Sequence, residues 1–597
     1  MKQKRKRFAA ALMLWLFLIP NVLLSIPVGA VGNDVIRVGL YTGSSCLSSA
    51  NLLNENGSGY RFGIYGSDGS FTTLAATGQS AITMMKDHNI YLSGGTYSAS
   101  RRDDSDSVVG CWHLRLEGTF ESLTAAALAA EELQGGFPAW VDGDWLVCFG
   151  SYETKTEAQN AASAKKEITT PDGTHRKTLP YTAGSGCIVV TATGTTRILY
   201  EFEISGQALG VQPICSDGEA LTWFKGRLYY GGFEYSRPSG NDLQVVNVVA
   251  MERYVAGVVA GEVYPEWPME TLKAAACAAR TFAKRCTKHS QQGFDVCAST
   301  CCQAYVGSPQ SEEARERVLR AAEETAGECI RYNGELIEAL YSHSNGGIRE
   351  AAVNAWGVDL PYLTACLDPF ESLYECSYES AMSYWEYEMS VDEVTELLQR
   401  WGWDNGRIVD IRVTEFTEAG CVNALEIEDE NGRVWTRTGD DVRLFESASD
   451  SRYFSRKFTV IAPGETGVFI KISAAEENET SVLVGEVPEF ASKAAAEAAA
   501  SLTAARSSLS STARLRGSIT VEETLSDTVE LIATAKGYPD ARVEKIVVRN
   551  DSENFLFVGS GWGHNLGMSQ CGAKAMADLG YTYRQILDFY YPGTTVG

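Results

Sequence analysis

One stretch of the chain, residues 251–280, places a single acid in an apolar background. Its sequence is MERYVAGVVAGEVYPEWPMETLKAAACAAR, in which Glu262 is surrounded by valine, alanine and glycine. An apolar setting disfavours the charged form of a carboxyl group, so Glu262 is a candidate general acid. Pro268 suits a first helical turn, and the alanine-rich run after it predicts a helix that ends near Arg285.

Two cations follow on this predicted helix. Lys273 and Arg280 are seven residues apart, so they share one face of the helix and could point into one cleft. The alternative is a solvated pair of cations beside a structural acid, since a motif is only a hypothesis until its structural context is known.

Further motifs occur along the chain in a fixed order. They are MERY at 251–254, GEV at 261–263, LKA at 272–274, AART at 278–281, YSHSNGG at 341–347 and GWGHNLGMSQCGA at 561–573. Together they resemble the SpoIID/LytB family of lytic transglycosylases, which cut the glycan strands of peptidoglycan. The resemblance implies an α+β multi-domain protein, with a mixed, β-rich catalytic region at 186–597 and an α/β insertion at about 382–443. Within the insertion, residues 391–403 predict an amphipathic helix and residues 408–437 predict two alternating strands.

The resemblance also implies a mechanism that uses one carboxyl group. Glu262 would protonate the glycosidic oxygen and then, as a carboxylate, take a proton from the C6 hydroxyl of muramic acid, which closes on C1 to give an anhydro product. No cofactor is required for this chemistry. The residues expected to bind or orient the glycan are Lys273, Arg280, Tyr341, Ser342, Ser344, Asn345 and His564.

Two other functions remain open at this stage. One is a non-catalytic peptidoglycan-binding or amidase-enhancing protein of the same fold, acting with a cell-wall amidase or another hydrolase. The other is a hydrolase that uses water and therefore needs a second carboxylate near Glu262. The sequence offers Asp295, Asp359 and Asp368 for that role without placing them.

A thiol and imidazole cluster is the candidate metal site. His289, Cys297, Cys301 and Cys302 fall within fourteen residues, and such soft ligands in a compact loop suit one structural zinc ion. Relatives carry a histidine where Cys301 stands, and Cys286 is a substitute ligand. Adjacent cysteines do not easily bind one ion, so free thiols are the alternative.

The N-terminal segment predicts export. Residues 1–30 combine a basic cluster, an apolar run and a small-residue cleavage pattern, which fits a signal peptide or an N-terminal membrane anchor. The expected location is therefore extracytoplasmic: the protein is secreted, held in the cell wall, or anchored on the outer face of the membrane. A formal net charge of −25 argues against a nucleic-acid partner, because phosphate binding needs clustered Lys and Arg.

Residues 111–180 contain an internal repeat. GTFESLTAA at 118–126 and GSYETKTEA at 150–158 each follow a strand-like run and lead into an alanine-rich helix. Two strand-turn-helix halves predict a small ferredoxin-like α/β sandwich, and this layout resembles the SPOR domain, a binder of peptidoglycan glycan. The alternative is a generic sandwich of the same shape. Residues 31–110 read as a β-rich region, and 491–517 as an Ala/Ser-rich linker or surface helix.

Overall fold

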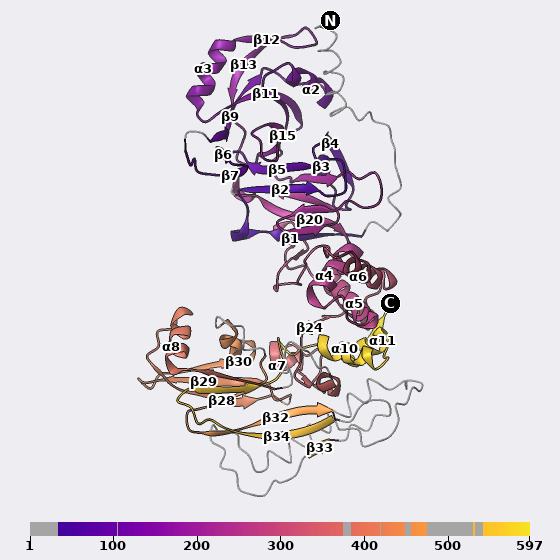
Figure 1. Ribbon diagram of the computed structural model, residues 1–597, viewed down its shortest axis with the longest axis vertical. Helices are drawn as coiled ribbons and strands as arrows, with labels where there is room; N and C mark the ends of the chain where they lie inside the picture. The colour runs from indigo at the N-terminus through magenta and orange to yellow at the C-terminus, as the bar shows by residue number, and fades with distance from the viewer. Residues whose placement is uncertain are drawn as a thin grey trace. The chain divides into compact units, whose positions relative to one another are not determined.

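The computed structural model describes residues 34–103, 106–240, 242–373, 384–417, 419–447, 455–474, 529–531 and 541–597 (Figure 1). These residues form a mixed α+β, multi-domain protein with many sheets. The chain divides into two compact units, each treated by itself below. The first unit is Met1–Glu262 with Cys286–Leu319, and the second is Val263–Arg285 with Arg320–Gly597.

The first unit contains two large sheets. The seven-stranded sheet has the order β21 (Val296–Cys297), β1 (Val35–Tyr41), β20 (Gln244–Ala250), β19 (Gly232–Ser236), β16 (Leu209–Pro213), β3 (Tyr60–Tyr65) and β4 (Phe71–Thr77). The eleven-stranded sheet has the order β12 (Glu167–Thr169), β13 (His175–Tyr181), β9 (Trp112–Leu116), β11 (Asp144–Tyr152), β10 (Gly136–Val141), β15 (Ile198–Glu203), β14 (Ile188–Ala192), β5 (Ala81–Lys86), β2 (Ser49–Asn54), β17 (Thr222–Phe224) and β18 (Arg227–Tyr229). A small sheet contains β7 (Thr96–Ser98), β6 (Ile90–Ser93) and β8 (Ser107–Val109).

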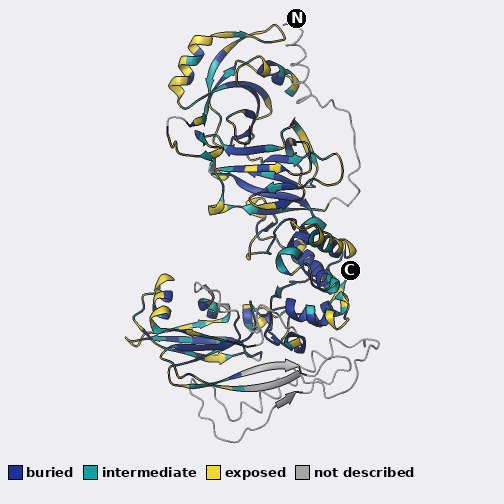
Figure 2. Ribbon diagram, viewed as in Figure 1, coloured by how far each residue is buried: buried dark blue, intermediate teal, exposed yellow. Residues whose placement is uncertain are grey.

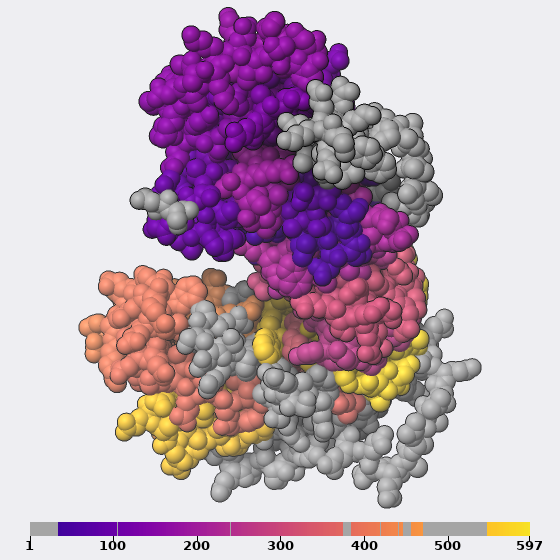
Figure 3. Space-filling model, turned by 45° about the horizontal axis from the view of Figure 1, so that its top comes forward, coloured from indigo at the N-terminus to yellow at the C-terminus, as the bar shows by residue number. Residues whose placement is uncertain are grey.

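The region at 112–181 has the order strand, helix, strand, strand, helix, short strand, strand. Its four long strands are neighbours in the order β13-β9-β11-β10, and each pairs antiparallel with the next. The helices are α2 (Leu123–Glu131) and α3 (Lys155–Lys165). Both start where the sequence repeat supplies an N-cap, because Ser122 and Thr154 each accept a hydrogen bond from the third residue of the following helix. In the space-filling view these residues, in purple, form a continuous surface (Figure 3).

This region does not have a sheet of its own. Strand β10 also pairs in parallel with β15, which lies beyond residue 186, and β14 in turn pairs with β5, which lies before residue 110. Strands from 31–110 and from 186–250 therefore alternate within both large sheets. The expected boundaries at 110 and 186 separate stretches of sequence, whereas the hydrogen-bonded sheet runs across them.

The second unit packs helices and small sheets around three apolar clusters of its described residues. Its helices are α5 (Met269–Arg285), α7 (Ala352–Trp356), α8 (Val391–Arg400), α10 (Gln570–Asp578) and α11 (Tyr583–Tyr590), while α6 (Glu312–Glu324) crosses between the units. Its sheets are β23 (Glu335–Leu336) with β22 (Ile330–Tyr332) and β37 (Thr595–Val596); β24 (Tyr341–Ser342) with β36 (Met568–Ser569); β25 (Ile348–Arg349) with β26 (Cys366–Leu367); β27 (Trp385–Met389) with β35 (Phe555–Gly559) and β31 (Phe458–Ile461); and β32 (Thr466–Ala474) with β34 (Ala541–Arg549) and β33 (Val529–Leu531).

The region at 385–438 differs from the sequence prediction in one respect. The amphipathic helix expected after Ser390 is present as α8, whose N-cap Ser390 and Glu393 form a capping box. The two strands expected after it are three, in a meander of β28 (Ile408–Phe416), β29 (Val422–Asp429) and β30 (Val434–Thr438). The additional strand arises because the chain reverses again at Gly432, which has a φ of 74°.

Two sequence predictions lie outside the described residues. They are the signal peptide or membrane anchor at 1–30 and the whole Ala/Ser-rich segment at 491–517. Among the helices of the described part, none is both long and apolar enough to cross a membrane.

Candidate functional site

Glu262 is the last residue of helix α4 (Met251–Glu262). The sequence predicted a helix only after Pro268, because the run VAGVVAGEV is rich in valine and glycine, which are weak helix formers. The helix forms nevertheless, and it buries seven of its residues, namely Met251, Tyr254, Val255, Ala256, Gly257, Val258 and Val259. Tertiary packing therefore overrides the low intrinsic propensity of this segment.

Two glycines let another segment lie directly on α4. A Cβ on Gly257 would come within 2.6 Å of the carbonyl oxygen of Gly307, and one on Gly261 within 2.0 Å of the carbonyl oxygen of Ala304. Segment 303–307 is further held by a hydrogen bond from the Tyr254 hydroxyl to the Gln303 side chain, at 2.8 Å. The glycine spacing thus fixes where residues 303–307 run relative to the end of α4.

This packing brings a backbone donor to the acid. The Ala304 amide donates to Oε1 of Glu262 at 2.6 Å, and the Glu262 side chain is partly buried. The C-terminal end of a helix disfavours negative charge, whereas the amide stabilises it. A carboxyl group held between these opposing effects, with part of its surface exposed, can both donate and accept a proton.

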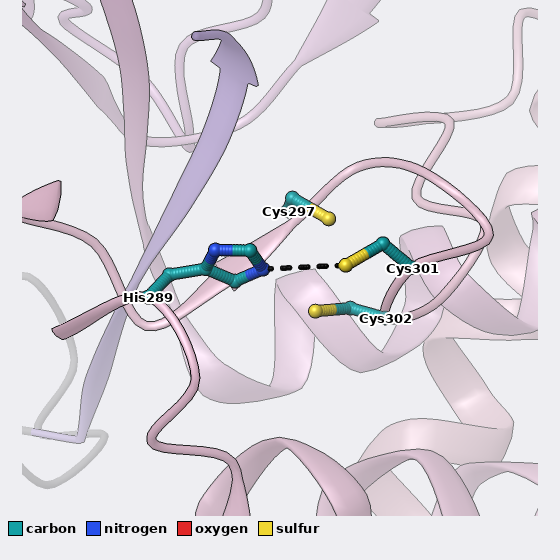
Figure 4. Close-up of side chains that lie close together, drawn as sticks. All are labelled: His289, Cys297, Cys301 and Cys302. Carbon is teal, nitrogen blue, oxygen red and sulfur yellow. Dashed lines mark hydrogen bonds between the residues drawn. The ribbon is translucent and has the colours of Figure 1, made fainter. Parts of the chain in front are cut away.

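The four predicted metal ligands meet in the first unit. The ligand atoms of His289, Cys297, Cys301 and Cys302 all lie within 4.8 Å of one another (Figure 4). His289 Nε2 is 3.7 Å from Cys301 Sγ. A tetrahedral zinc ion with bonds of about 2.0 to 2.3 Å would hold its ligand atoms roughly 3.6 to 3.8 Å apart, so the group fits zinc. Both adjacent cysteines belong to the group, and Cys286 does not.

The surroundings act differently on the ligand atoms of the cluster, and burial raises the pKa of the Cys302 thiol. His289 Nδ1 lies 2.9 Å from the Gln292 side-chain oxygen, an arrangement in which Nδ1 donates and Nε2 keeps its lone pair for a ligand. Burial alone would raise the pKa of the Cys297 thiol, but hydrogen bonds from Ser299, Cys302 and Cys301 outweigh it and lower that pKa. A lower thiol pKa favours the thiolate, which is the form that binds metal.

Most of helix α5 in the second unit is buried, as its mainly dark blue ribbon shows (Figure 2). Lys273 and Arg280, both in this helix, have different environments. Lys273 is partly buried, and its Nζ is 3.2 Å from Glu270 Oε1 and 2.6 Å from Glu324 Oε2. Arg280 is fully buried and donates to the carbonyl oxygens of Glu328 at 3.0 Å and Ala322 at 3.1 Å. The expectation of two cations pointing into one cleft is wrong for Arg280, because its guanidinium holds backbone carbonyls inside the unit.

The YSHSNGG motif supplies a buried network instead of an open sugar site. Ser344 and Asn345 are both fully buried. The Ser344 hydroxyl donates to Glu371 Oε2 at 2.5 Å, the Asn345 amide donates to Glu371 Oε1 at 2.8 Å, and Asn345 Nδ2 donates to Asp368 Oδ2 at 2.8 Å. Ser569 of the C-terminal motif donates to Glu371, and the Tyr590 hydroxyl donates to Asp368 at 2.6 Å. In this structure Ser344 and Asn345 have no exposed surface through which to contact a sugar.

Burial raises the pKa of Glu371 to about 7, and the charge of Asp368 adds to the effect. Burial likewise raises the pKa of Asp368. Both acids are thus held by donors on loops from distant parts of the chain, which ties the loops together. The sequence prediction missed Glu371 altogether; the one available signal was its position three residues after Asp368, a spacing that puts two acids on one side of a turn.

The remaining predicted residues of the second unit are less deeply buried or partly unsatisfied. Tyr341 is partly buried in β24, while Ser342 is buried and its hydroxyl has no hydrogen-bond partner among the described residues. His564 is partly buried, and its Nδ1 accepts a hydrogen bond from the Leu566 amide at 3.0 Å. His564 therefore braces its own glycine-rich loop.

The three carboxylates considered as the second acid of a water-using hydrolase each have a different environment. Asp295 Oδ2 accepts the Arg37 backbone amide at 2.8 Å, Asp359 is exposed, and Asp368 is buried in its network. Glu262 belongs to the first unit, and the seven predicted glycan-binding residues belong to the second.

Comparison with known proteins gives a match on this region. A profile described as "SpoIID: Stage II sporulation protein" matches residues 239–332, which include Glu262, α5 and the His/Cys cluster. The "Amidase enhancer" of Bacillus subtilis (strain 168) is 26% identical over 348 residues, covering 57% of this chain and 40% of the relative. "Stage II sporulation protein D" of the same organism is 30% identical over 141 residues, covering 21% of this chain and 41% of the relative.

An uncharacterized protein of Brachyspira hyodysenteriae is 39% identical over 137 residues, covering 23% of this chain and 36% of the relative. The chain thus spans about two fifths of the length of these curated relatives. Residues 239–332 are thus similar to the SpoIID family, and the similarity to Stage II sporulation protein D covers about a fifth of this chain.

Proposed function

We propose that this protein is a peptidoglycan lytic transglycosylase in which Glu262 acts as both acid and base. The observation that carries the proposal is the geometry of Glu262, a partly exposed acid at the end of a buried helix with a backbone amide 2.6 Å from one oxygen. The segment that supplies this amide packs directly against α4 at Gly257 and Gly261. The chain therefore holds one carboxyl group in a fixed place, which is what a one-acid mechanism requires.

The reaction needs no water and no second carboxylate. Glu262 in its neutral form gives its proton to the glycosidic oxygen as the bond from muramic acid C1 breaks. The resulting carboxylate then takes the proton of the C6 hydroxyl, whose oxygen bonds to C1 and forms the anhydro ring. Glu262 is neutral again, so the cycle closes with atoms and charge balanced. The Ala304 amide, which donates to Oε1 of Glu262 at 2.6 Å, stabilises the carboxylate stage.

The test is replacement of Glu262 by glutamine, which keeps the shape and removes proton transfer. We expect release of anhydro-muramic ends from purified glycan strands to fall by about 10² to 10⁴-fold or more, with glycan binding retained. The matched control is Glu266→Gln, an exposed carboxylate four residues further along the chain. Equal product release by the Glu262 and Glu266 variants, at equal folded concentration, would eliminate Glu262 as the catalyst.

The second candidate is an amidase-enhancing or other non-catalytic peptidoglycan-binding protein. It is favoured by the longest match reported above, since the relative named "Amidase enhancer" covers 57% of this chain. The buried state of Arg280 points the same way, because it removes one expected substrate contact. A wild-type protein that releases no anhydro ends from any glycan, yet increases the rate of a cell-wall amidase on intact sacculi, would establish this candidate.

We further propose that the His/Cys cluster holds one zinc ion with a structural role. Zinc at this position would fix residues 297–302, and these lead directly into the segment that carries the Ala304 amide. Its binding would therefore support the placement of Glu262 without any step of the reaction passing through the metal. Four protein ligands would leave no position for a catalytic water.

Removal of one thiolate tests the zinc site. Cys297→Ser should lower the zinc content by about one equivalent per chain and lower the thermal midpoint, with Cys286→Ser as the control outside the group. Unchanged zinc content and stability in Cys297→Ser would contradict a metal role for the cluster.

The setting of the proposed function is the cell wall. The strand order at 112–181 is that of a ferredoxin-like sandwich, which supports the SPOR interpretation and a second contact with glycan strands. Export, suggested by the sequence of residues 1–30, would place the protein outside the cytoplasm, and engulfment during sporulation is the process that we propose. Binding of the full chain to sacculi with and without peptide stems measures the glycan preference.

A further inference from the structure

A second cluster of ligating side chains lies in the first unit, outside the site described above. Asp87 follows strand β5, His113 lies in β9 and Glu201 lies in β15. One ligand atom from each residue lies within 4.8 Å of the other two. His113 and Glu201 have no exposed surface, and Asp87 is partly buried.

The sheet has to curve to bring these residues together. Strands β9 and β15 are separated by β11 and β10, so their backbones would be about 14 Å apart in a flat sheet with strands about 4.8 Å apart. His113 Nε2 is nevertheless 3.1 Å from Glu201 Oε1. The apolar core that the sheet wraps around includes Phe137, whose ring meets the His113 imidazole edge-on at 5.1 Å.

Four buried polar atoms of the cluster have no hydrogen-bond partner among the described residues. They are Asp87 Oδ1, His113 Nε2, Glu201 Oε1 and Glu201 Oε2. His113 Nε2 and Glu201 Oε1 lie 3.1 Å apart, so they form an ion pair only when His113 carries a proton on Nε2 as well. Leaving a buried polar atom without a partner costs about 1 to 3 kcal/mol, and more for a charged one, so the structure calls for something to satisfy them together.

The imidazole is oriented as metal-binding histidines usually are. His113 Nδ1 is 2.8 Å from the carbonyl oxygen of Gly150. A carbonyl oxygen only accepts, so Nδ1 carries the proton and a neutral imidazole directs the lone pair of Nε2 into the cluster.

We propose that Asp87, His113 and Glu201 bind one divalent transition-metal cation, separate from the zinc proposed at the His/Cys cluster. Two carboxylates and one neutral imidazole balance the two positive charges, so the buried site would be neutral overall. This ligand set suits zinc or manganese, and nitrogen with oxygen ligands distinguishes it from the sulfur-rich first cluster.

A cation bound at this site would link stretch 112–181 to the strands that precede and follow it in the sequence. His113 belongs to the ferredoxin-type stretch at 112–181, whereas Asp87 and Glu201 come from the strands before and after it. A bound cation would fix that stretch to the rest of the sheet independently of the β10–β15 pairing. The competing interpretation is an internal ion pair in which a protonated His113 faces Glu201 and no metal is present.

The test uses cobalt as the probe in the full chain, because its spectrum reports the ligand type. Metal-free wild-type protein should take up about two equivalents, and Cys297→Ser protein about one that lacks the thiolate-to-cobalt charge-transfer band. Adding Glu201→Gln to Cys297→Ser should abolish this uptake and also the rise in thermal midpoint on addition of zinc. Glu203→Gln, on the same strand and outside the cluster, should preserve both.

Two results would overturn the proposal. One is that Cys297→Ser protein takes up neither cobalt nor zinc. In this variant Asp87, His113 and Glu201 are all intact, so the absence of uptake would speak directly against a site there. The other is equal cation uptake by the Glu201 and Glu203 variants. If the Glu201 double variant does not fold, Asp87→Asn in the Cys297→Ser background replaces it, since Asp87 is the more exposed ligand.

Discussion

The surroundings of Glu262 and the network around Glu371 use acids in opposite ways. Glu262 accepts a hydrogen bond from the Ala304 amide and keeps part of its side chain exposed. Glu371 is almost fully buried and accepts hydrogen bonds from Ser344, Asn345 and Ser569. Both regions are built from motifs that resemble the same family. Burial separates the structural role of Glu371, which holds loops together, from the catalytic role that we propose for Glu262.

The largest expected effect is a loss of stability on replacement of Arg280. Arg280→Met should lower the free energy of unfolding by about 3 to 5 kcal/mol, because the carbonyl oxygens of Ala322 and Glu328 lose their buried donor. Urea unfolding measures the change, and Arg285→Met, an exposed arginine paired with Glu338, is the control. Normal stability with weakened glycan binding would instead make Arg280 a substrate contact.

The second effect is a pH dependence from Glu371. Its pKa of about 7 in the folded protein exceeds the ordinary value of 4.5, so the folded state binds the proton more tightly. Stability should therefore fall as the pH rises from about 4.5 to about 7, by about 3 kcal/mol in total, and then level off.

Glu371→Gln should flatten this dependence in urea unfolding series between about pH 4.5 and 8. The exposed Glu335→Gln is the matched control. A slope in Glu371→Gln equal to that of Glu335→Gln would assign the pH dependence to other groups.

The smallest expected stability effect is that of replacing Gly257, in the helix that ends at Glu262. A methyl group there would meet Tyr305 Cε2 at 2.5 Å, so Gly257→Ala should cost about 1 to 3 kcal/mol through overpacking. It should also lower glycan cleavage, because segment 303–307 carries the Ala304 amide that contacts Glu262. Gly186→Ala, where a methyl group meets nothing within 4 Å, should change neither quantity.

Local patterns in the sequence predicted the elements whose signals are themselves local. The helix from Met269 to Arg285 and helix α8 follow from a proline start, a capping box and periodicity. Helix α4 could not be predicted in this way, since its glycines are explained only by the approach of residues 303–307, more than forty positions away. The α+β, multi-domain class is confirmed, but the mixing of strands between regions depends on pairings that no local signal specifies.

The candidate site likewise contains residues that are close in sequence, which could be predicted, and residues joined only by long-range contacts, which could not. The His/Cys cluster could be proposed because its four residues are close in sequence, and the structure brings their ligand atoms together. The contact between Ser569 and Glu371 joins residues 198 positions apart, and the cluster at Asp87 and Glu201 likewise depends on how the sheet curves. Sequence reasoning assigned Ser344, Asn345 and Arg280 to substrate because it could not see which side of the chain would be covered.

Strand β20 ends at Ala250 and helix α4 begins at Met251, with no residue between them. A catalytic group on a loop can drift when the loop bends, but here the acid stands at the end of a continuous, hydrogen-bonded rod. The rod is anchored in the seven-stranded sheet, where β20 lies between β1 and β19. A displacement of Glu262 through its backbone would therefore have to move α4 and β20 together, which leaves the torsions of its own side chain as the adjustable part of the proposed proton donor.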